Sequence, residues 1–131
     1  MTQTADKVVG DAILTKTHQA DADITGNTFV KLVTPMPTGG PAHVVECGAG
    51  EAGVGVARDS QSNGRVVDVV FMGQMHVKAS ENIAAGAVVS SAANGQARNA
   101  VSTDHVLGRA ISDANSGDYV RVQLWYGGIK A

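Results

Sequence analysis

The chain has 131 residues, close to the commonest size of a single domain, and its ten basic and twelve acidic side chains give a formal charge of −2. These charges are spread without blocks, so the sequence lacks the basic stripe by which proteins bind nucleic acids. The single cysteine excludes an internal disulfide framework, and no apolar stretch is long enough to span a membrane or resembles a secretory signal. We therefore expect a soluble protein made in the cytoplasm, with no direct nucleic-acid or membrane partner.

The hydrophobic residues are many but small. They make up 44% of the chain, whereas aromatic residues make up only 4%, and there are 16 glycines. A core of valine, alanine, isoleucine and leucine is thin, and a small fold of this kind often gains stability by association. We expect the protein to form oligomers.

Residues 1–27 are mostly polar and show no clear periodicity, apart from a short apolar island. The island contains Val8, Val9, Ile13 and Leu14. Three structures suit such a segment: an edge strand, an extended arm that becomes ordered on a partner, or a frayed terminus. We predict an N-terminal arm over residues 1–27 and a single β-domain over residues 28–131.

Residues 28–33 (TFVKLV) predict a strand, because Phe29 and the β-branched residues favour a pleated, half-buried surface. All three prolines follow within residues 34–41, and a stretch so rich in proline forms a loop rather than a central strand. Residues 43–47 predict the next strand, and the glycine-rich residues 48–53 the next turn.

Residues 108–126 predict a β-hairpin. Residues 120–125 alternate between apolar and polar or aromatic side chains, which is the period of a half-buried strand. Residues 112–117 (SDANSG) supply turn formers, and Gly108 marks a bend or bulge in the partner strand.

The same pattern occurs 53 residues earlier, in residues 55–71, again with a polar turn that ends in glycine. An Asn-Gly turn between alternating segments is typical of hairpins. Five identical pairs share the one offset: Gly55 and Gly108, Ala57 and Ala110, Gly64 and Gly117, Val67 and Val120, Val69 and Val122. The sequence therefore predicts a duplicated two-stranded unit.

Between the two hairpins, residues 74–78 predict a separate short strand. Residues 79–89 predict at most one helical turn, since Gly86 interrupts a longer helix, and residues 88–98 predict another small hairpin. Turn signals thus recur about every eight to twelve residues, the spacing of sandwiches and barrels. We predict an all-β fold: a small β-sandwich or barrel of short strands and hairpins with an extended N-terminal arm.

Residues 48–53 (GAGEAG) form a literal G-x-G-x-x-G motif. A dinucleotide site requires this turn to open a helix, so that the pyrophosphate binds the exposed helical N–H groups. The next residues, VGVAR, alternate like a strand, and no βαβ unit is visible. We interpret these glycines as turn residues.

Metal-binding and catalytic patterns are weak. His18, His43, His76 and His105 lie far apart without metal-ligand spacing. Cys47 and His43 share a strand face but are about 13 Å apart there, so we interpret Cys47 as a buried structural thiol.

Two groups of acidic residues are equally weak candidates. Asp104 precedes His105, but no nucleophile elbow or oxyanion turn accompanies them. Asp21 and Asp23 lie in a polar segment where solvation is the default. We predict a protein that is not an enzyme and has no metal or cofactor.

The one tryptophan, Trp125, is followed by Tyr126 and falls on the outward phase of the last strand. An outward pair of aromatic residues is suited to anchor a contact with a partner. The alternative is that a second sheet covers this face.

Several segments, taken in order, resemble the small capsid decoration, or cement, proteins of tailed bacteriophages. They are TFVKLV with the Pro/Gly-rich loop after it, GEAGVGVA before a strand that ends in FMG, IAAGAVVSSAANGQA, and LGRAISDANSGDYVRVQLW. The likeness covers most of residues 28–126. It implies a non-enzymatic, β-rich virion protein on the outer capsid surface, which forms a homotrimer, bridges major capsid protein subunits and stabilises the shell against the pressure of packaged DNA.

On this interpretation the contact residues belong to the arm and to the end of the last strand. They are Val8, Val9, Ile13, Leu14, Trp125 and Tyr126. One alternative is another virion module, such as the base of a head fibre or a tail component. The other is a small β-barrel enzyme or ligand-binding domain, which would show a pocket where His43, His76 and Cys47 converge.

Overall fold

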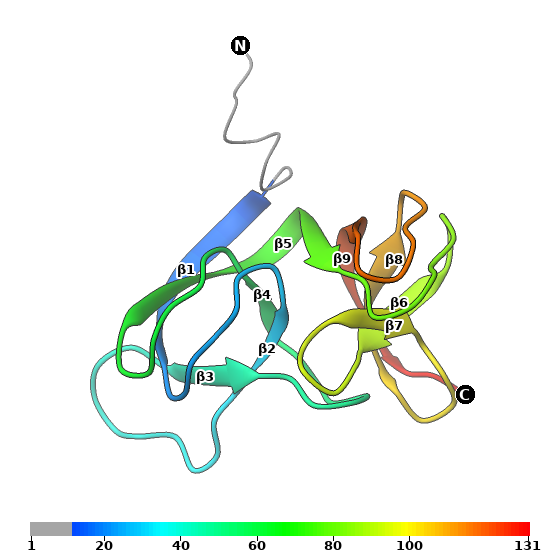
Figure 1. The fold of residues 1–131 in the computed structure, drawn as a ribbon. Coiled ribbons are helices and arrows are strands. Elements are labelled where there is room, and N and C mark those ends of the chain that lie inside the picture. Colours follow the sequence, from blue (N-terminus) through cyan, green and yellow to red (C-terminus); the bar gives the residue numbers. More distant parts are fainter. Residues whose placement is uncertain (1–11) are drawn as a thin grey trace.

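The computed structural model describes residues 12–131 and places nine strands in this range (Figure 1). They are β1 (Ala12–Ala20), β2 (Phe29–Leu32), β3 (His43–Glu46), β4 (Gly55–Ala57), β5 (Val66–Lys78), β6 (Val88–Ser91), β7 (Ala97–Asn99), β8 (His105–Ala110) and β9 (Tyr119–Ile129). No helix occurs in this range, and so none there is long and apolar enough to cross a membrane. The all-β prediction is confirmed.

The strands form two rings that share β5. Ring one follows the order β1-β3-β2-β4-β5, and β1 pairs with β5 to close a five-stranded barrel. Ring two continues from the second half of β5 through β9, β8, β6 and β7, and it meets the end of β5 again at the bridge between Ala79 and Ala97. Figure 1 shows the two rings side by side with β5 running from one to the other.

Residues 74–78 are not the separate strand that the sequence predicts. They continue β5, whose first half pairs with β1 and β4 and whose second half pairs with β9. Gly73 lies between the halves with a φ of +107°. A glycine adopts such a backbone at little cost, which lets one strand change direction and serve both rings.

The two rings repeat each other in register. Val30 faces Glu46 in ring one, and Val89 faces Asn99 in ring two. The first members of these pairs are 59 residues apart and the second members 53. The same two offsets relate the pairings of Thr15 to Gln19 with β5 to those of β5 with β9. They also relate every pairing of β2 with β3 and β4, and of β4 with β5, to a pairing among β6, β7, β8 and β9. The predicted duplication of residues 55–71 is therefore confirmed, and it extends over the whole described chain.

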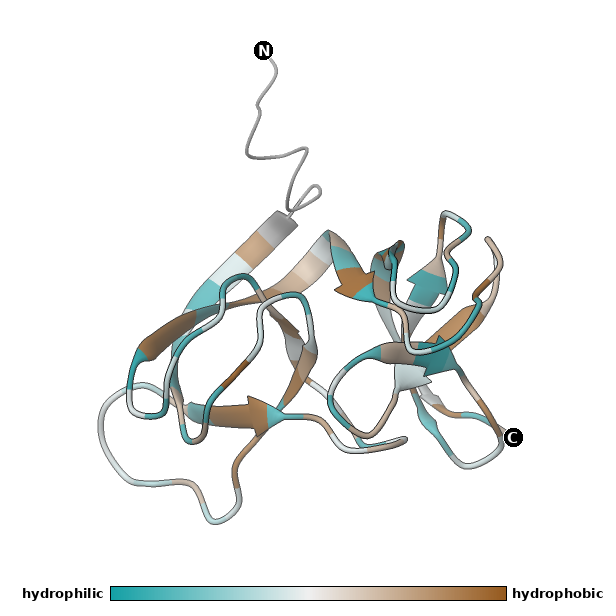
Figure 2. Cartoon of the chain, in the orientation of Figure 1, coloured by the Kyte–Doolittle hydropathy of each residue, from teal (hydrophilic) through white to brown (hydrophobic). Residues whose placement is uncertain are grey.

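The cores repeat as well. One buried cluster lies within ring one, and each of its seven members has a counterpart in the larger cluster of ring two. The pairs are Ala20 and Ala79, Ile24 and Ile83, Val30 and Val89, Val44 and Ala97, Ala57 and Ala110, Val67 and Val120, Val69 and Val122. The larger cluster also takes in Phe29, Val56 and Val70, which are ring-one residues that pack against ring two. Figure 2 shows the hydrophobic residues gathered on the strands, while the loops are mostly pale or teal.

Side chains close the equivalent turns in the same way. Asp23 accepts the N–H of Asn63 at 2.9 Å, and its counterpart Asn82 accepts the N–H of Ser116 at 2.9 Å. A short side chain that accepts a backbone N–H is a usual means of fixing a turn. Asp23 therefore has a structural task in ring one.

The described part of the predicted arm, residues 12–27, belongs to ring one. β1 pairs with β5 in antiparallel and with β3 in parallel orientation, and both Ala20 and Ile24 are buried. The boundary predicted at residue 27 thus falls between two strands of one barrel. Val8 and Val9 lie outside the described residues.

Two equivalent glycines have no room for a side chain. A Cβ at Gly108 would lie 2.6 Å from the carbonyl oxygen of Gln123, and a Cβ at Gly55 would collide with the carbonyl oxygen of Val70. Gly108 also sits at the predicted bulge, where the β8–β9 register shifts. Close approach of the facing strand, and not only the turn chemistry, therefore requires glycine at this repeat position.

We expect Gly55→Ala and Gly108→Ala each to lower the free energy of unfolding by about 1–3 kcal/mol, because the added methyl group forces paired strands apart. Urea unfolding followed by circular dichroism measures this loss. Val66→Ala is the control, since Val66 is largely exposed on β5 of the same ring and should change stability by less than about 0.5 kcal/mol. Equal stability of the glycine variants and the control would contradict the packing argument.

Candidate partner-binding surface

Candidate contact residues from both ends of the chain meet at the middle of β5. Leu14 on β1 lies opposite Met72 on β5. Tyr126 near the end of β9 donates its hydroxyl to the carbonyl oxygen of Phe71 at 3.0 Å and to that of Val54 at 3.1 Å. Since Phe71 and Met72 are adjacent, residues more than a hundred positions apart reach one point where the two rings join.

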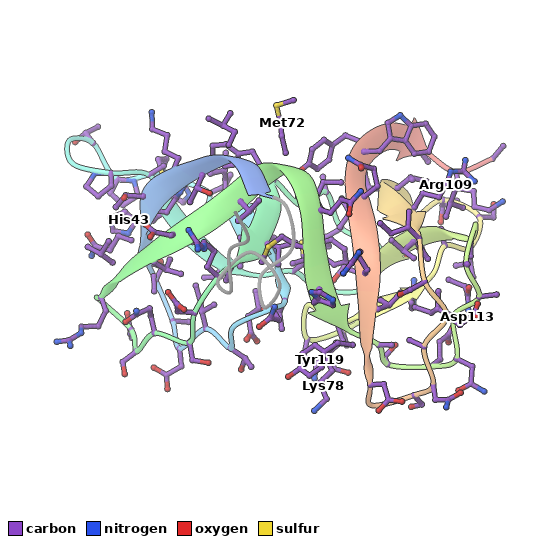
Figure 3. The ribbon with its side chains drawn as sticks, turned by 90° about the horizontal axis from the view of Figure 1, so that it is seen from above. His43, Met72, Lys78, Arg109, Asp113 and Tyr119 are labelled. Atoms are coloured by element: carbon purple, nitrogen blue, oxygen red, sulfur yellow. The ribbon has the colours of Figure 1, made fainter. Side chains whose placement is uncertain are left out.

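We define the junction patch as Leu14, Met72, Trp125 and Tyr126. Each of these side chains is about half exposed, between 47% and 52%. Figure 3 shows Met72 pointing away from the ribbon, with the end of β9 between it and Arg109 along the same edge of the molecule. Neighbouring large apolar groups that remain exposed are typical of a contact surface.

Trp125 is outward, as the alternation predicts. Val120, Val122 and Leu124 are buried on the opposite phase, and no second sheet of the described chain covers the indole. The guanidinium of Arg109 lies 5.5 Å from the centre of the ring, a cation–π contact. The indole also lies against the backbone of Gly127, where a Cβ would approach it to 3.0 Å. These two contacts fix the orientation of the exposed ring.

Tyr126 also links β9 to ring one through the two hydrogen bonds of its hydroxyl. Burial, and to a lesser degree the nearby Cys47, raises the pKa of Tyr126 to about 12, so the hydroxyl stays protonated and keeps donating at neutral pH. Its ring edge is exposed while its hydroxyl is engaged. The residue therefore presents apolar area in a fixed position.

The other predicted contact residues are less well placed by the structure. Ile13 lies in β1, where the described side chains begin at Leu14, and Val8 and Val9 precede the described residues. Met72 is a member of the patch that the sequence reasoning missed. It precedes Trp125 by 53 residues and is its counterpart in ring one, so the repeat offset contained the signal.

The G-x-G-x-x-G stretch joins the two rings. Gly50, at a φ of +70°, donates its N–H to the carbonyl oxygen of Ser91 at 2.9 Å and accepts the N–H of His105 at 3.0 Å. The chain then enters β4 at Gly55 and forms no helix there. The interpretation as turn glycines is confirmed, because a pyrophosphate would find no helix N-terminus at this turn.

Asp104 is the centre of a buried polar network. Its carboxylate accepts hydrogen bonds from Ser90 Oγ at 2.6 Å, from Arg98 Nη2 at 2.9 Å and from the N–H of Val101 at 3.1 Å. Burial alone would raise the pKa of Asp104, but these hydrogen bonds outweigh it and hold the pKa below its ordinary value.

Ring one carries the same device at the equivalent position. Glu51 accepts the N–H of Gly48 at 2.6 Å and pairs with Lys31 Nζ at 2.6 Å. The counterparts of Glu51, Gly48 and Lys31 in ring two are Asp104, Val101 and Ser90. Because the network recurs with the fold, it is a structural device that joins each loop to its ring.

The histidines and the thiol stay apart. Within residues 12–131 no group of three His, Cys, Asp or Glu side chains is arranged to hold a metal ion. His43 Nδ1 lies 3.1 Å from Asp21 Oδ1, and His18 packs edge-on against Phe71. Cys47 is 1% exposed, and burial, followed by the charge of Glu51, raises its pKa to about 12. The thiol is thus protonated and buried, as predicted.

We expect Asp104→Asn to lower stability at pH 7 by about 2–3 kcal/mol, because Arg98 loses its charged partner in a buried network. Since folding depresses the pKa of Asp104, its contribution is present above the ordinary aspartate pKa of about 4 and is lost as the pH falls through the lower folded value. Urea unfolding at neutral and acid pH measures both effects. The difference between wild type and variant should shrink in acid; a difference that persists unchanged there would contradict the charge argument.

Residues 8–124 match the family described as phage cement protein. Among solved structures, the crystal structure of the head fiber gp8.5 N base in bacteriophage phi29 is similar, with a TM-score of 0.73. The match has 15% sequence identity and covers 90% of this chain and 98% of that one. No curated protein sequence matches the chain.

Proposed function

The chain belongs to the phage cement protein family, and we propose that it binds the outer surface of the phage head and bridges neighbouring subunits of the major capsid protein. The observation that carries capsid decoration is the family match over residues 8–124, nearly the whole chain. In this role the protein stabilises the shell against the pressure of packaged DNA. It is made in the host cytoplasm, works without a catalytic step and has no metal or cofactor.

The junction patch supplies the main capsid contact. Two half-exposed aromatic rings and two aliphatic side chains, held by Arg109, Gly127 and the hydroxyl of Tyr126, offer apolar area with little side-chain entropy left to lose. β1 begins directly beside this patch, since Ala12 faces Gly73. In this proposal Val8, Val9 and Ile13 contribute to the same contact.

Binding stabilises the shell by mass action. A ligand that binds only the assembled subunits favours assembly in proportion to its concentration over its dissociation constant. Self-association into a homotrimer multiplies the contacts that one cement particle makes, and linked sites raise the apparent affinity without any new contact. The small cores of both rings, built mostly of alanine and valine, support an oligomer on energetic grounds.

A second candidate is the base of a head fibre. The fold shared with the phi29 head fiber N base, over 98% of that chain, favours it. Mass spectrometry of the polypeptide recovered from purified heads distinguishes the two. A species of 131 residues supports decoration by this chain alone, and a longer species that continues into a fibre supports the alternative.

We expect Trp125→Ala to weaken binding to heads that lack the protein by at least about ten-fold, since an aromatic anchor at an interface contributes more than about 1.4 kcal/mol. Co-sedimentation over a range of protein concentrations measures the affinity. Tyr119→Ala is the matched control, because Tyr119 is equally exposed but lies beside Lys78 on the edge opposite Met72 (Figure 3). Equal losses in both variants, or none in Trp125→Ala, would remove the junction patch from the capsid contact.

Deletion of residues 1–11 tests the arm separately, because it leaves every described strand intact. We expect reduced head occupancy in co-sedimentation and an unchanged urea midpoint. Full occupancy at every concentration would show that residues 1–11 take no part in binding.

A further inference from the structure

The turn between β6 and β7 docks ring two onto ring one. The carbonyl oxygen of Gly95 accepts the N–H of Phe29 at 2.7 Å, and a Cβ at Gly95 would lie 2.9 Å from the Cβ of Thr28. Phe29 is 1% exposed and Thr28 is 2% exposed. This corner of the repeat is thus one half of an interface, and the start of β2 is the other half.

Because of the repeat, each ring has a turn and a strand start at these positions. The turn of ring one and the strand start of ring two are the unused halves. The counterpart of the β6–β7 turn is the proline loop, residues 34–42, which Figure 1 shows projecting from ring one away from ring two. The counterparts of Thr28 and Phe29 are Ala87 and Val88, which are only partly buried. Within the described chain, the proline loop meets no second ring and Val88 lies under no turn of this kind.

The proline loop is an addition that the barrel itself does not need. Leu32 faces Val44 across it, and Ser91 faces Ala97 across the shorter turn, with eleven and five residues between the partners. Both connections begin with the same bond: the N–H of Val33 to the carbonyl oxygen of His43, and that of Ala92 to Gln96. A short turn therefore closes the same strand pair, and the six extra residues are not needed to close it.

Both unused halves carry exposed or partly exposed apolar side chains. The proline loop contains no ionisable side chain, and seven of its nine residues are exposed. Leu32 beside it is 42% exposed, whereas its counterpart Ser91 is fully buried at the contact between rings. On ring two, Val101 is 53% exposed and follows Ala100, whose N–H bonds the carbonyl oxygen of Val88 at 3.0 Å. Unburied apolar side chains thus lie on ring one at the proline loop and on ring two at Val88 and Val101.

We propose that the proline loop and Leu32 of one copy dock on the face of ring two formed by Ala87, Val88 and Val101 of a second copy. This contact repeats between molecules the contact that joins the two rings within one molecule. It deepens the self-association in the proposed function and rests on it. Because the two surfaces differ, the interface is heterologous and joins copies head to tail, closing into a ring of copies when the rotation permits. Three prolines in the loop limit the conformational entropy that docking removes.

Complementation between two damaged copies tests this arrangement. Leu32→Arg damages only the loop side, and Val101→Arg damages only the ring-two side; both residues are exposed, so the fold tolerates the change. We expect each variant alone to sediment as a monomer at concentrations where the wild type is oligomeric. An equal mixture should form a complex of one copy of each, because each partner retains the surface that the other lacks. Ile111→Arg, at an exposed position on neither surface, is the control and should remain oligomeric.

Replacement of residues 34–42 by Ala-Asn-Gly, the sequence that closes the equivalent turn of ring two, is a second loop-side variant. It should behave like Leu32→Arg, both alone and in the mixture with Val101→Arg. An oligomer that survives Leu32→Arg, or a mixture that stays monomeric, overturns the inference. Head binding is measured on the same samples: a wild-type oligomer that fails to bind heads contradicts the proposed function, whereas monomeric variants that still bind heads leave capsid decoration intact.

Discussion

β5 belongs to both rings, and the remainder of the structure depends on that shared strand. Its first half closes ring one through β1 and β4, and its second half starts ring two through β9. Neither barrel is complete without it, since each small core is covered partly by residues of this strand, such as Val69 in ring one and Val77 in ring two. The two halves of the duplication are therefore one cooperative unit, and damage to β5 affects both.

The shared strand also places the binding surface. Because the start of β1 pairs with β5 at Gly73 and Tyr126 reaches back to Phe71, the first described strand and the last strand converge on the point where one ring passes into the other. The contact residues are thus attached to the strand that both rings share. A surface whose side chains lose little conformational entropy on binding keeps more of the contact free energy as affinity.

Part of the duplicated fold was predictable from the sequence, and the reason differs from one segment to another. The identities between residues 55–71 and 108–124 fall on buried valines and alanines, on glycines that face a neighbouring backbone and on turn glycines at positive φ, so they remain visible in the chain. The repeat of β1 and β2 was hidden, because the proline loop changes the offset from 53 to 59 and few identities, such as Ile24 with Ile83, survive. The sequence predicted a strand end at Gly73, because a glycine within a strand pattern usually marks an interruption. In the structure this glycine bends β5, and the strand continues beyond it.

The candidate contact surface was also only partly predictable from the sequence. Alternation placed Trp125 outward, because that depends only on neighbours in one strand. The link from Tyr126 to Phe71 and the exposure of Met72 depend on how two rings pack, which no local pattern contains. The proline loop was recognised as a loop, but its excess over the equivalent turn of ring two becomes evident only when the registers are aligned.

The closure of ring one by β1 has a mechanical consequence for a protein that is fastened to a shell. β1 lies antiparallel to β5 from Ala12 to Gln19, so tension that enters at the first described residue runs along the strand axis. The ladder is loaded in shear, with its hydrogen bonds sharing the force, when the opposing force acts on β5 at the far end, near Val66. Tension between Ala12 and the junction patch acts instead at one end of the ladder and opens its hydrogen bonds one after another.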